Sequence, residues 1–345
     1  MEKIDLLSLT LEELEQEMQA MGAARYRAGQ IFSWLHEKQV LDFTGMTTLS
    51  QQFRTELSEK FCIKRLNIVR KLASSIDNTV KYLYQLPDGN FVETVLMEYH
   101  HGTSICISTQ VGCRMGCRFC ASAIAGFIRN LEPSELLLQI YETQLDAKRP
   151  IDSIVLMGIG EPLDNYDNVL RFFSLLSHPK GFGMSLRHVT VSTCGIVPKI
   201  LELADQKLGV TLSVSLHSPE NATRSEVMPV NRTWPIEVLM DACRTYVQKT
   251  GRRITFEYAV MDNVNSARSD AKKLADLLRG GNFHVNLIPV NPIRERNYKT
   301  LRKTVQLFQD TLTQYGVNAT VRRTLGSDIQ AACGQLRRDV MTQKK

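Results

Sequence analysis

Hydrophobic residues in positions 1–61 recur at the three- and four-residue spacing of amphipathic helices. Thr10-Leu-Glu-Glu13 is a capping-box pattern that predicts the start of a first helix, and Gly22 predicts its end. The same spacing predicts two further short helices near 26–37 and 49–60. Because these helices carry little catalytic chemistry, residues 1–62 are interpreted as a small helical accessory domain.

The pattern changes to the alternation of β-strands after residue 65. Segments 80–86 and 91–97 flank Asp88-Gly89, which is typical of a β-hairpin, and residues 63–100 are interpreted as a hairpin extension. Glu93 lies among apolar residues of the second strand. An acid in such a strand usually faces solvent, and the local pattern favours that interpretation.

From residue 101 onward, strand patterns alternate with helical ones. Six strands are predicted, at 104–109, 152–157, 187–193, 210–216, 253–260 and 284–289. This alternation predicts an α/β fold with a parallel sheet, and the missing final pairs of an eightfold barrel favour an open, partial (β/α)6 TIM-like barrel. The barrel core is assigned to residues 101–300, and a C-terminal helix, strand and basic tail to 301–345.

Composition narrows the class of protein. The 345 residues contain eight cysteines, three of them in one short loop, which is typical of reduced thiols in the cytoplasm rather than of a disulfide framework. No apolar run approaches the roughly 18 residues of a membrane span, and charges near the N-terminus differ from a secretory signal. We therefore expect a cytoplasmic protein without membrane association.

Positive charge is concentrated at the C-terminal end. Residues 279–345 contain twelve Lys/Arg and four Asp/Glu, a balance of +8, so the remaining 278 residues carry −2 of the net +6. This asymmetry suits a polyanionic partner such as a nucleic acid. A solvated helix face would give the same pattern, so charge alone leaves both interpretations open.

Cys113-Arg-Met-Gly-Cys117-Arg-Phe-Cys120 is the chemically most specific stretch. Structural zinc requires four closed ligands, and no second cysteine pair follows, although zinc or plain structural cysteines remain alternatives. Three cysteines on a [4Fe–4S] cluster would leave one iron open to another ligand, and this is the favoured interpretation. The loop resembles the signature of the radical S-adenosylmethionine (SAM) superfamily, whose open iron is chelated by SAM.

Polar clusters follow the later strands, where a barrel of this kind places its chemistry. Each cluster alone is typical of a turn, a helix cap or a core histidine. Together, at the edge that carries the cysteine loop, they predict a SAM-binding rim. The rim residues are Gly160, Glu161, Ser192, Ser215, Leu216, His217 and Asn291.

Several motifs together resemble the RlmN family of radical SAM methyltransferases. They are the cysteine loop, Met-Gly-Ile-Gly-Glu161-Pro162-Leu, Ser192-Thr-Cys-Gly-Ile-Val-Pro198, Ser215-Leu-His217-Ser-Pro219, Met228-Pro-Val-Asn231 and Ala331-Ala-Cys333-Gly-Gln-Leu336. The family methylates C2 of an adenosine in 23S ribosomal RNA and, in some members, an adenosine in transfer RNA. The resemblance implies a [4Fe–4S] cluster and SAM as cofactors. An electron donor such as flavodoxin or ferredoxin is also expected, with a monomeric state.

The resemblance assigns roles to individual residues. Cys113, Cys117 and Cys120 would bind the cluster, and the rim residues would bind SAM. Cys333 would carry a methyl group taken from a first SAM, and a radical from a second SAM would activate that group for addition to C2. Glu93 would accept the C2 proton, against the solvent-facing interpretation, and Cys106 would attack the sulfur of Cys333 to release the RNA. Cys62, Cys194 and Cys243 are expected to be buried and inert.

Three alternatives compete with this assignment. A Cfr-like enzyme would methylate C8 of the same adenosine, but Gly-Glu161-Pro and Ile-Pro-Val-Asn291-Pro favour the C2 enzyme, although Val290 replaces a frequent tryptophan. A radical SAM enzyme that modifies peptides would not need the basic tail or the pair Cys106 and Cys333. A non-catalytic iron–sulfur protein that binds or senses RNA would not need a SAM-binding rim.

Overall fold

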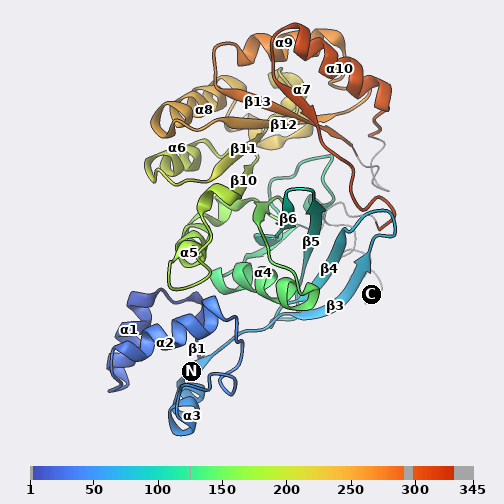
Figure 1. Ribbon diagram of the computed structural model, residues 1–345. Helices are drawn as coiled ribbons and strands as arrows, with labels where there is room; N and C mark the ends of the chain where they lie inside the picture. The colour runs from blue at the N-terminus through green and yellow to red at the C-terminus, as the bar shows by residue number, and fades with distance from the viewer. Residues whose placement is uncertain (1–2, 125, 291–297, 330–345) are drawn as a thin grey trace.

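A single mixed sheet forms the centre of the molecule (Figure 1). The computed structural model describes residues 3–124, 126–290 and 298–329, so Asn291 and Cys333 lie outside the described residues. Within these ranges the sheet has ten strands in the order β14-β13-β12-β11-β10-β9-β6-β5-β4-β3. In this part of the chain no helix combines the length and apolar character that crossing a membrane requires.

The predicted strands of the barrel are confirmed, and they run parallel from β6 through β9 to β13. A further parallel strand, β14, extends the sheet beyond them. The strands are β6 (Gly102–Cys106), β9 (Ser153–Leu156), β10 (Val189–Thr193), β11 (Thr211–Ser215), β12 (Ile254–Val260), β13 (Phe283–Pro289) and β14 (Ala319–Val321). The helices of this part are α4 (Pro133–Ala147), α5 (Tyr166–Ser177), α6 (Val197–Asp205), α7 (Asn221–Val227), α8 (Ile236–Thr250), α9 (Arg268–Leu278) and α10 (Arg302–Gln314).

The predicted hairpin is confirmed as β4 (Val80–Gln85) and β5 (Phe91–Tyr99), and β5 pairs antiparallel with β6, so the hairpin continues the main sheet. A strand that the sequence pattern did not predict, β3 (Asn67–Ala73), pairs with β4. Its side chains are mostly exposed, so its sequence lacks the apolar alternation of a half-buried strand. A second short pair, β7 (Gln110–Gly112) and β8 (Phe127–Asn130), holds the cysteine loop.

The N-terminal helices are α1 (Leu11–Ala20), α2 (Tyr26–Phe32) with a π-helical turn at Ser33–Glu37, and α3 (Gln51–Lys60). The predicted capping box is present, because Thr10 and Glu13 exchange backbone and side-chain hydrogen bonds of 2.9 and 3.3 Å. A small parallel pair that was not predicted, β1 (Ile4–Asp5) and β2 (Phe61–Cys62), joins the two ends of this region.

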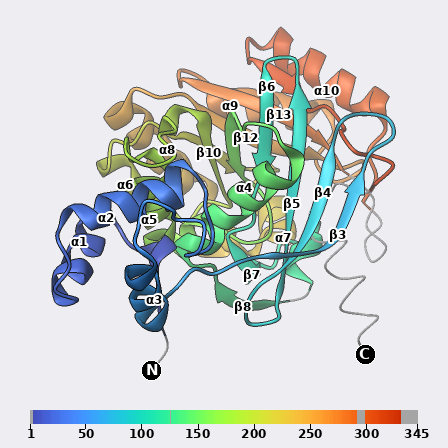
Figure 2. The same ribbon diagram turned by 60° about the horizontal axis from the view of Figure 1, so that its bottom comes forward.

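Helix α4 lies between the sheet and the N-terminal helices (Figures 1 and 2). Its run of buried side chains extends around the helix instead of forming one stripe, as expected for a helix covered on two sides. His36 of the N-terminal region reaches the Tyr141 hydroxyl of α4 at 3.1 Å. Burial lowers the pKa of His36 to about 3, with a smaller effect from His178, so this imidazole is neutral in the folded protein.

We expect the His36→Gln variant to lose less stability than the wild type as pH falls below neutral. In the unfolded chain His36 is protonated below about pH 6.5, but in the folded protein it stays neutral down to about pH 3, so the wild type loses stability as pH falls through this window. Because the variant lacks this titrating group, its slope of unfolding free energy against pH should be smaller by up to about 1.4 kcal/mol per pH unit. Urea titrations between pH 7 and 4.5 measure it, with exposed His188→Gln as the control; equal slopes for both variants would contradict the assignment.

Candidate active site

A cavity of about 360 Å³ opens at the carboxyl ends of the parallel strands, and most of the predicted site residues surround it. This is the edge of the sheet where such barrels place their chemistry. The predicted residues in its wall are Cys106, Cys113, Cys117, Cys120, Gly160, Glu161, Ser192, Ser215 and His217. Leu216 is fully buried beside them, and Glu93 is buried on the strand that continues the cavity wall.

Strands β7 and β8 hold the base of the cysteine loop. Gly112 has φ of 80°, and a Cβ atom there would lie 1.7 Å from the Gly126 carbonyl oxygen, so this position requires glycine. The Cys113 amide donates to the same carbonyl at 3.1 Å, and the Cys120 amide donates to the Cys117 carbonyl at 3.2 Å. The loop is therefore shaped by backbone contacts within and at its base.

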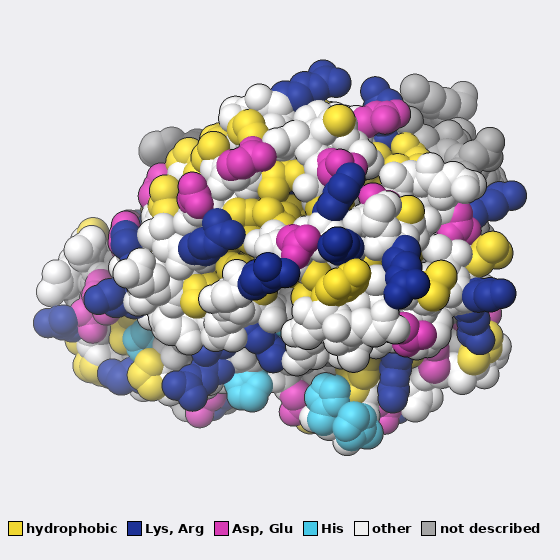
Figure 3. All heavy atoms as spheres, turned by 90° about the horizontal axis from the view of Figure 1, so that it is seen from above, with side chains coloured by type: hydrophobic (Ala, Val, Ile, Leu, Met, Phe, Trp, Pro, Cys, Tyr) yellow, Lys and Arg dark blue, Asp and Glu magenta, His cyan; other side chains and the backbone are white. Residues whose placement is uncertain are grey.

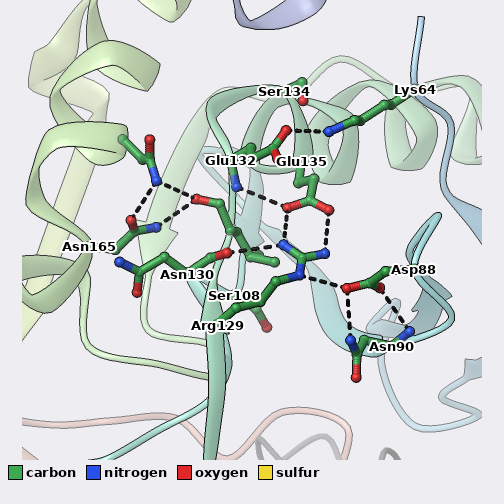
Figure 4. A network of polar contacts seen from close by, with 12 residues as sticks. Lys64, Asp88, Asn90, Ser108, Arg129, Asn130, Glu132, Ser134, Glu135 and Asn165 are labelled. Atoms are coloured by element: carbon green, nitrogen blue, oxygen red, sulfur yellow. Dashed lines mark hydrogen bonds and ion pairs between the residues drawn. The ribbon is translucent and has the colours of Figure 1, made fainter. Parts of the chain in front are cut away.

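A polar network ties this base to neighbouring elements (Figure 4). Arg129 of β8 forms two hydrogen bonds of 2.7 and 2.8 Å with Glu135 of α4 and one of 2.6 Å with Asp88 in the β4–β5 turn. Glu135 also accepts a hydrogen bond from the Glu132 amide, and Glu132 pairs with Lys64. The cysteine loop is thus attached to α4 and to the hairpin, and both of these are fixed by the core.

The thiols of the loop form an electrostatically coupled group. Burial raises the pKa of Cys113 to about 12 and that of Cys117 still further, and Cys120 raises both because neighbouring thiolates repel one another. A positively charged centre is what such a group needs in order to be ionised. The arrangement therefore suits a metal cluster.

The number of loop thiols is compatible with a cluster. A closed structural zinc site takes four protein ligands, whereas three cysteines on a [4Fe–4S] cluster would leave one iron open to another ligand. Three thiols in one cavity wall fit this requirement.

Gly160 and Glu161 lie at the start of the turn after β9. Gly160 has φ of 112°, and a Cβ atom there would approach the Gln110 amide nitrogen to 2.7 Å, so the turn packs directly on β7. The buried Glu161 carboxylate accepts hydrogen bonds from the amides of Cys194 at 2.7 Å and Leu163 at 3.1 Å. Burial raises the pKa of Glu161 in spite of these bonds. The carboxylate thus joins the ends of β9 and β10 in the cavity wall.

His217 is held as a neutral imidazole. Its Nδ1 accepts a hydrogen bond of 2.9 Å from the Ala259 amide, which leaves the proton on Nε2. Burial lowers its pKa to about 3, with a smaller effect from Arg224. The backbone φ of 56° is unusual for histidine, and its ring meets the Phe119 ring edge-on at 4.6 Å. Phe119 belongs to the cysteine loop, so His217 connects the loop to the end of β11.

Arg224 is a site residue that the sequence did not reveal. Its buried guanidinium donates to the carbonyls of Cys194, Ser215 and Leu216 at 2.8, 3.0 and 3.1 Å and to the Asn231 side chain at 2.8 Å. It thereby fixes the ends of β10 and β11 from below the cavity. The nearest sequence signal was Asn231 in its motif, since the arginine itself lies in an ordinary helical stretch.

Glu93 faces the barrel interior, so the solvent-facing interpretation of the local pattern is wrong. Its carboxylate lies 2.9 Å from the Lys81 ammonium, and both side chains are almost completely buried. Two residues further along the same face of β5, Val95 is paired in register with Cys106. Cys106 lines the cavity and packs with Val95, Met97 and Leu325. Glu93 and Cys106 therefore belong to one face of the sheet.

The three cysteines that were expected to be buried and inert differ in their burial and position. Cys243 is fully buried in α8, as expected, whereas Cys62 is only half-buried. Cys194 is buried but forms part of the cavity wall beside Glu161. Burial raises its pKa well above the usual value, which keeps the thiol protonated.

The chain resembles known proteins over nearly its whole length. A model of the Radical SAM superfamily matches residues 107–278, and a model described as the ribosomal RNA large subunit methyltransferase N-terminal domain matches residues 4–63.

A relative from Lachnoclostridium phytofermentans, named a probable dual-specificity RNA methyltransferase RlmN, is 49% identical over 98% of this chain and 95% of its own. One from Alkaliphilus oremlandii with the same name is 50% identical over 98% of both chains. The crystal structure of a radical SAM methyltransferase from Sphaerobacter thermophilus aligns with a TM-score of 0.93 and 42% identity, over 96% of this chain and 98% of that one.

Proposed function

The chain belongs to the RlmN family of radical SAM RNA methyltransferases, and on that premise we propose that it methylates C2 of an adenosine in 23S ribosomal RNA. The matched N-terminal domain is named for methylation of large-subunit ribosomal RNA, which supports this substrate. The dual-specificity names of the relatives support a second RNA class, for which we propose transfer RNA. Membership in this family favours C2 over the Cfr-like alternative at C8.

The observation that carries the proposal is the shared cavity. The thiols of the cysteine loop, the turn at Gly160 and Glu161, and the ends of β10 and β11 surround one space, which Cys106 also lines. A cofactor bound there would lie against the residue that we assign to the last step of the reaction. Such a co-location is what positions reacting groups for catalysis.

Radical SAM enzymes use a [4Fe–4S] cluster and SAM, and the residues in the cavity wall fit both groups. When bound, the cluster supplies the electron for reductive cleavage of SAM. We assign the cluster to Cys113, Cys117 and Cys120. The residues assigned to SAM are Gly160, Glu161, Ser192, Ser215, Leu216, His217 and Asn291.

The protein's own residues perform the covalent and proton-transfer steps. Adenine C2 lies between two ring nitrogens and is too electron-poor to attack the SAM methyl group directly. We assign the methyl carrier to Cys333, and Glu93 accepts the proton from C2. Cys106, as a thiolate, then attacks the sulfur of Cys333 and forms a disulfide. The bond between that sulfur and the carbon now attached to C2 breaks, and the released carbon takes up a proton to become the new methyl group. The ion pair with Lys81 supports this assignment, because it fixes the position of the buried Glu93 carboxylate on the face of β5 that also carries Val95, the register partner of Cys106.

The monomeric state that the family resemblance implies stays a prediction. We place the protein in the cytoplasm, where ribosomal and transfer RNA are found. The electron required for SAM cleavage must come from a low-potential carrier, and flavodoxin or ferredoxin is the proposed donor.

On the face shown in Figure 3, basic side chains do not form a continuous patch. Figure 3 shows Lys and Arg interspersed with Asp and Glu on the face seen from above, a pattern typical of a solvated surface. Arg279, for example, pairs with Asp276 of α9 at 2.6 Å. We propose that RNA contacts the cavity, where Arg322 and Arg323 lie.

We expect Arg323→Ala to weaken RNA binding and to lower the slope of log affinity against log salt by about one unit, as for the loss of one phosphate contact. Arg323 is exposed at the cavity, whereas the Arg322 guanidinium points inward, 3.9 Å from the Met157 sulfur and close to Glu257. Burial raises the pKa of Glu257, and Arg322 opposes that shift. Filter binding from low to high salt measures the slope, with exposed Arg244→Ala on α8 as the control. Identical slopes for the two variants would assign Arg323 to the solvated surface.

The identity of the methylated nucleoside tests the proposed function. The cluster-loaded protein is incubated with SAM, a reductant and unmodified 23S ribosomal RNA, and the digested nucleosides are compared with standards by mass spectrometry. We expect 2-methyladenosine. Production of 8-methyladenosine would support the Cfr-like alternative, and SAM cleavage without RNA methylation would favour another radical SAM activity.

A further inference from the structure

Arg224 carries a buried positive charge whose hydrogen bonds go only to neutral groups of the described chain. The residue is 1% exposed. Its guanidinium donates to three backbone carbonyls and to the Asn231 side-chain oxygen. Burial lowers the pKa of Arg224 to about 10, so the guanidinium remains charged at neutral pH. A buried charge costs free energy unless an opposite charge lies close to it, so Arg224 needs an anionic partner.

The two arginines of the cysteine loop differ from Arg224. Arg114 pairs with Asp164 at 2.9 Å, and Arg118 lies 3.6 Å from Glu226. Their side chains are 51% and 45% exposed, so water and carboxylates already compensate both charges. Arg224 has neither kind of compensation in its own surroundings.

The buried Glu161 carboxylate and Arg224 bind the same residue through separate backbone groups. Glu161 accepts a hydrogen bond of 2.7 Å from the Cys194 amide, whereas Arg224 donates to the Cys194 carbonyl at 2.8 Å. Glu161 also accepts from the Leu163 amide and lines the cavity, where we assign it to SAM. Its charge is therefore directed to amides and to the proposed ligand, and the counter-charge of Arg224 is another group.

Arg224 lies next to the cysteine loop. Helix α7, which carries it, ends at Val227, and the Val227 carbonyl accepts a hydrogen bond of 2.9 Å from the Arg118 amide of the loop. Cys117 packs against the apolar cluster that contains Val227 and Cys194. The thiols of Cys194 and Cys117 partly oppose the effect of burial on the pKa of Arg224. The charge of Arg224 therefore acts on the loop to which we assign the cluster.

A cluster on this loop would be an anion. Three thiolates outweigh the positive charge of a [4Fe–4S] core, and the uptake of one electron makes the cluster more negative. A fixed positive charge nearby stabilises the reduced form more than the oxidised form, because net charge is one of the factors that set the potential of such clusters. Salt screens this attraction only weakly when the charges are buried.

We propose that Arg224 is the buried counter-charge of the [4Fe–4S] cluster and that it raises the reduction potential of the cluster. This inference rests on the proposed function, in which Cys113, Cys117 and Cys120 bind the cluster. The four hydrogen bonds of Arg224 fix its guanidinium in place. Arg224 is accordingly a positioning residue, which acts through the cluster and makes no contact with the RNA.

The reduction potential of the cluster tests the proposal without turnover. Protein with a reconstituted cluster, but without SAM or RNA, is titrated anaerobically with dithionite in the presence of redox mediators. Dithionite is oxidised as each cluster takes up one electron. The electron paramagnetic resonance signal of the reduced cluster, recorded against the measured potential, gives the midpoint.

We expect Arg224→Gln to lower the equilibrium constant for reduction about tenfold, which corresponds to a midpoint about 59 mV lower for one electron. Glutamine keeps an amide that can donate to the backbone carbonyls, but it carries no charge. Arg224→Lys keeps the charge with fewer directed donors, so its equilibrium constant should stay within about twofold of the wild type.

Arg252→Gln is the matched control. Arg252 is half-buried and donates to the Val210 carbonyl at 2.9 Å and to the Thr211 hydroxyl at 3.2 Å, at the beginning of β11. Arg224 binds the Ser215 carbonyl at the other end of the same strand. The control therefore removes one positive charge from β11 at the end away from the cavity, and it should keep the potential of the wild type.

A lower potential in Arg224→Gln, with Arg224→Lys and the control unchanged, supports the inference. It is also supported if Arg224→Gln loses the cluster while Arg224→Lys retains it at the wild-type potential. If Arg224→Lys is affected as strongly as Arg224→Gln, or if neither variant differs from the control, Arg224 acts only through its hydrogen bonds and the inference is wrong. Loss of the cluster from both variants leads to the same conclusion. A wild type that takes up no [4Fe–4S] cluster would instead overturn the proposed function, and the inference with it.

Discussion

Cys117→Ala is expected to remove most of the iron from the protein, from about four atoms per chain to less than one. Cys117 belongs to a loop whose three cysteines line one cavity wall, and its loss would leave two cysteines where the cluster is proposed to need three. Loss of the cluster also removes the electron source for SAM cleavage. Iron and sulfide analysis after anaerobic reconstitution measures the first effect, and release of 5′-deoxyadenosine under reducing conditions measures the second.

Cys243→Ala is the matched control for this experiment. Cys243 is fully buried, whereas Cys117 is half-buried, and Cys243 lies in α8 and outside the cavity wall. Its replacement should leave iron and SAM cleavage unchanged at the cost of a small packing defect. Stoichiometric zinc without iron in the wild type, or full iron in Cys117→Ala, would contradict the cluster assignment.

Long periodic segments were predictable from the sequence, and short irregular ones were not. Among the strands of the parallel sheet, pattern and structure agree at β12 and β13, which have seven residues each. Strands β7 and β8 have only three and four residues, and glycine at Gly112 weakens their pattern. Strand β3 is missed for another reason, because its exposed side chains show no apolar face.

The site was predictable where neighbouring residues in the sequence act together. The cysteine loop and the turn at Gly160 and Glu161 are local motifs, and the strand-end rule places them at one edge of the sheet. Arg224 and Lys81 could not be found in this way, because their partners come from other elements: backbone carbonyls for Arg224 and the β5 carboxylate for Lys81. The hydrogen bond from Ser74 to Asp328 likewise joins residues about 250 positions apart.

Glu93 shows how a local pattern can mislead. An acid between apolar residues predicts a solvent-facing side chain, and that holds when one face of a sheet is wet. Here the β5 strand has buried residues on both faces, and Lys81 on the neighbouring strand compensates the charge. The resemblance to a family suggested a role for Glu93 that no rule of periodicity could have suggested.

Cys106→Ala is expected to stop the reaction with the RNA attached to the protein, whereas Cys333→Ala should give neither product nor adduct. In the proposed sequence the methyl group on Cys333 is joined to C2 before Cys106 acts. Without Cys106 the sulfur of Cys333 has no attacking thiol, so each chain retains at most one RNA and turnover ceases. Without Cys333 no methyl group is carried, and the sequence stops before any bond to RNA forms.

A denaturing gel distinguishes the two variants, because only Cys106→Ala should show a slowly migrating band that ribonuclease removes. Neither substitution should release iron, since we assign the cluster to the separate loop of Cys113, Cys117 and Cys120. Cys106 packs between Val95, Met97 and Leu325, so alanine leaves a small void without exposing a charge, and the fold should survive. If neither variant formed an adduct while both retained the cluster and cleaved SAM, the order of the two cysteines would be wrong. The assignment of the cofactor site would then still stand, because it depends on other residues.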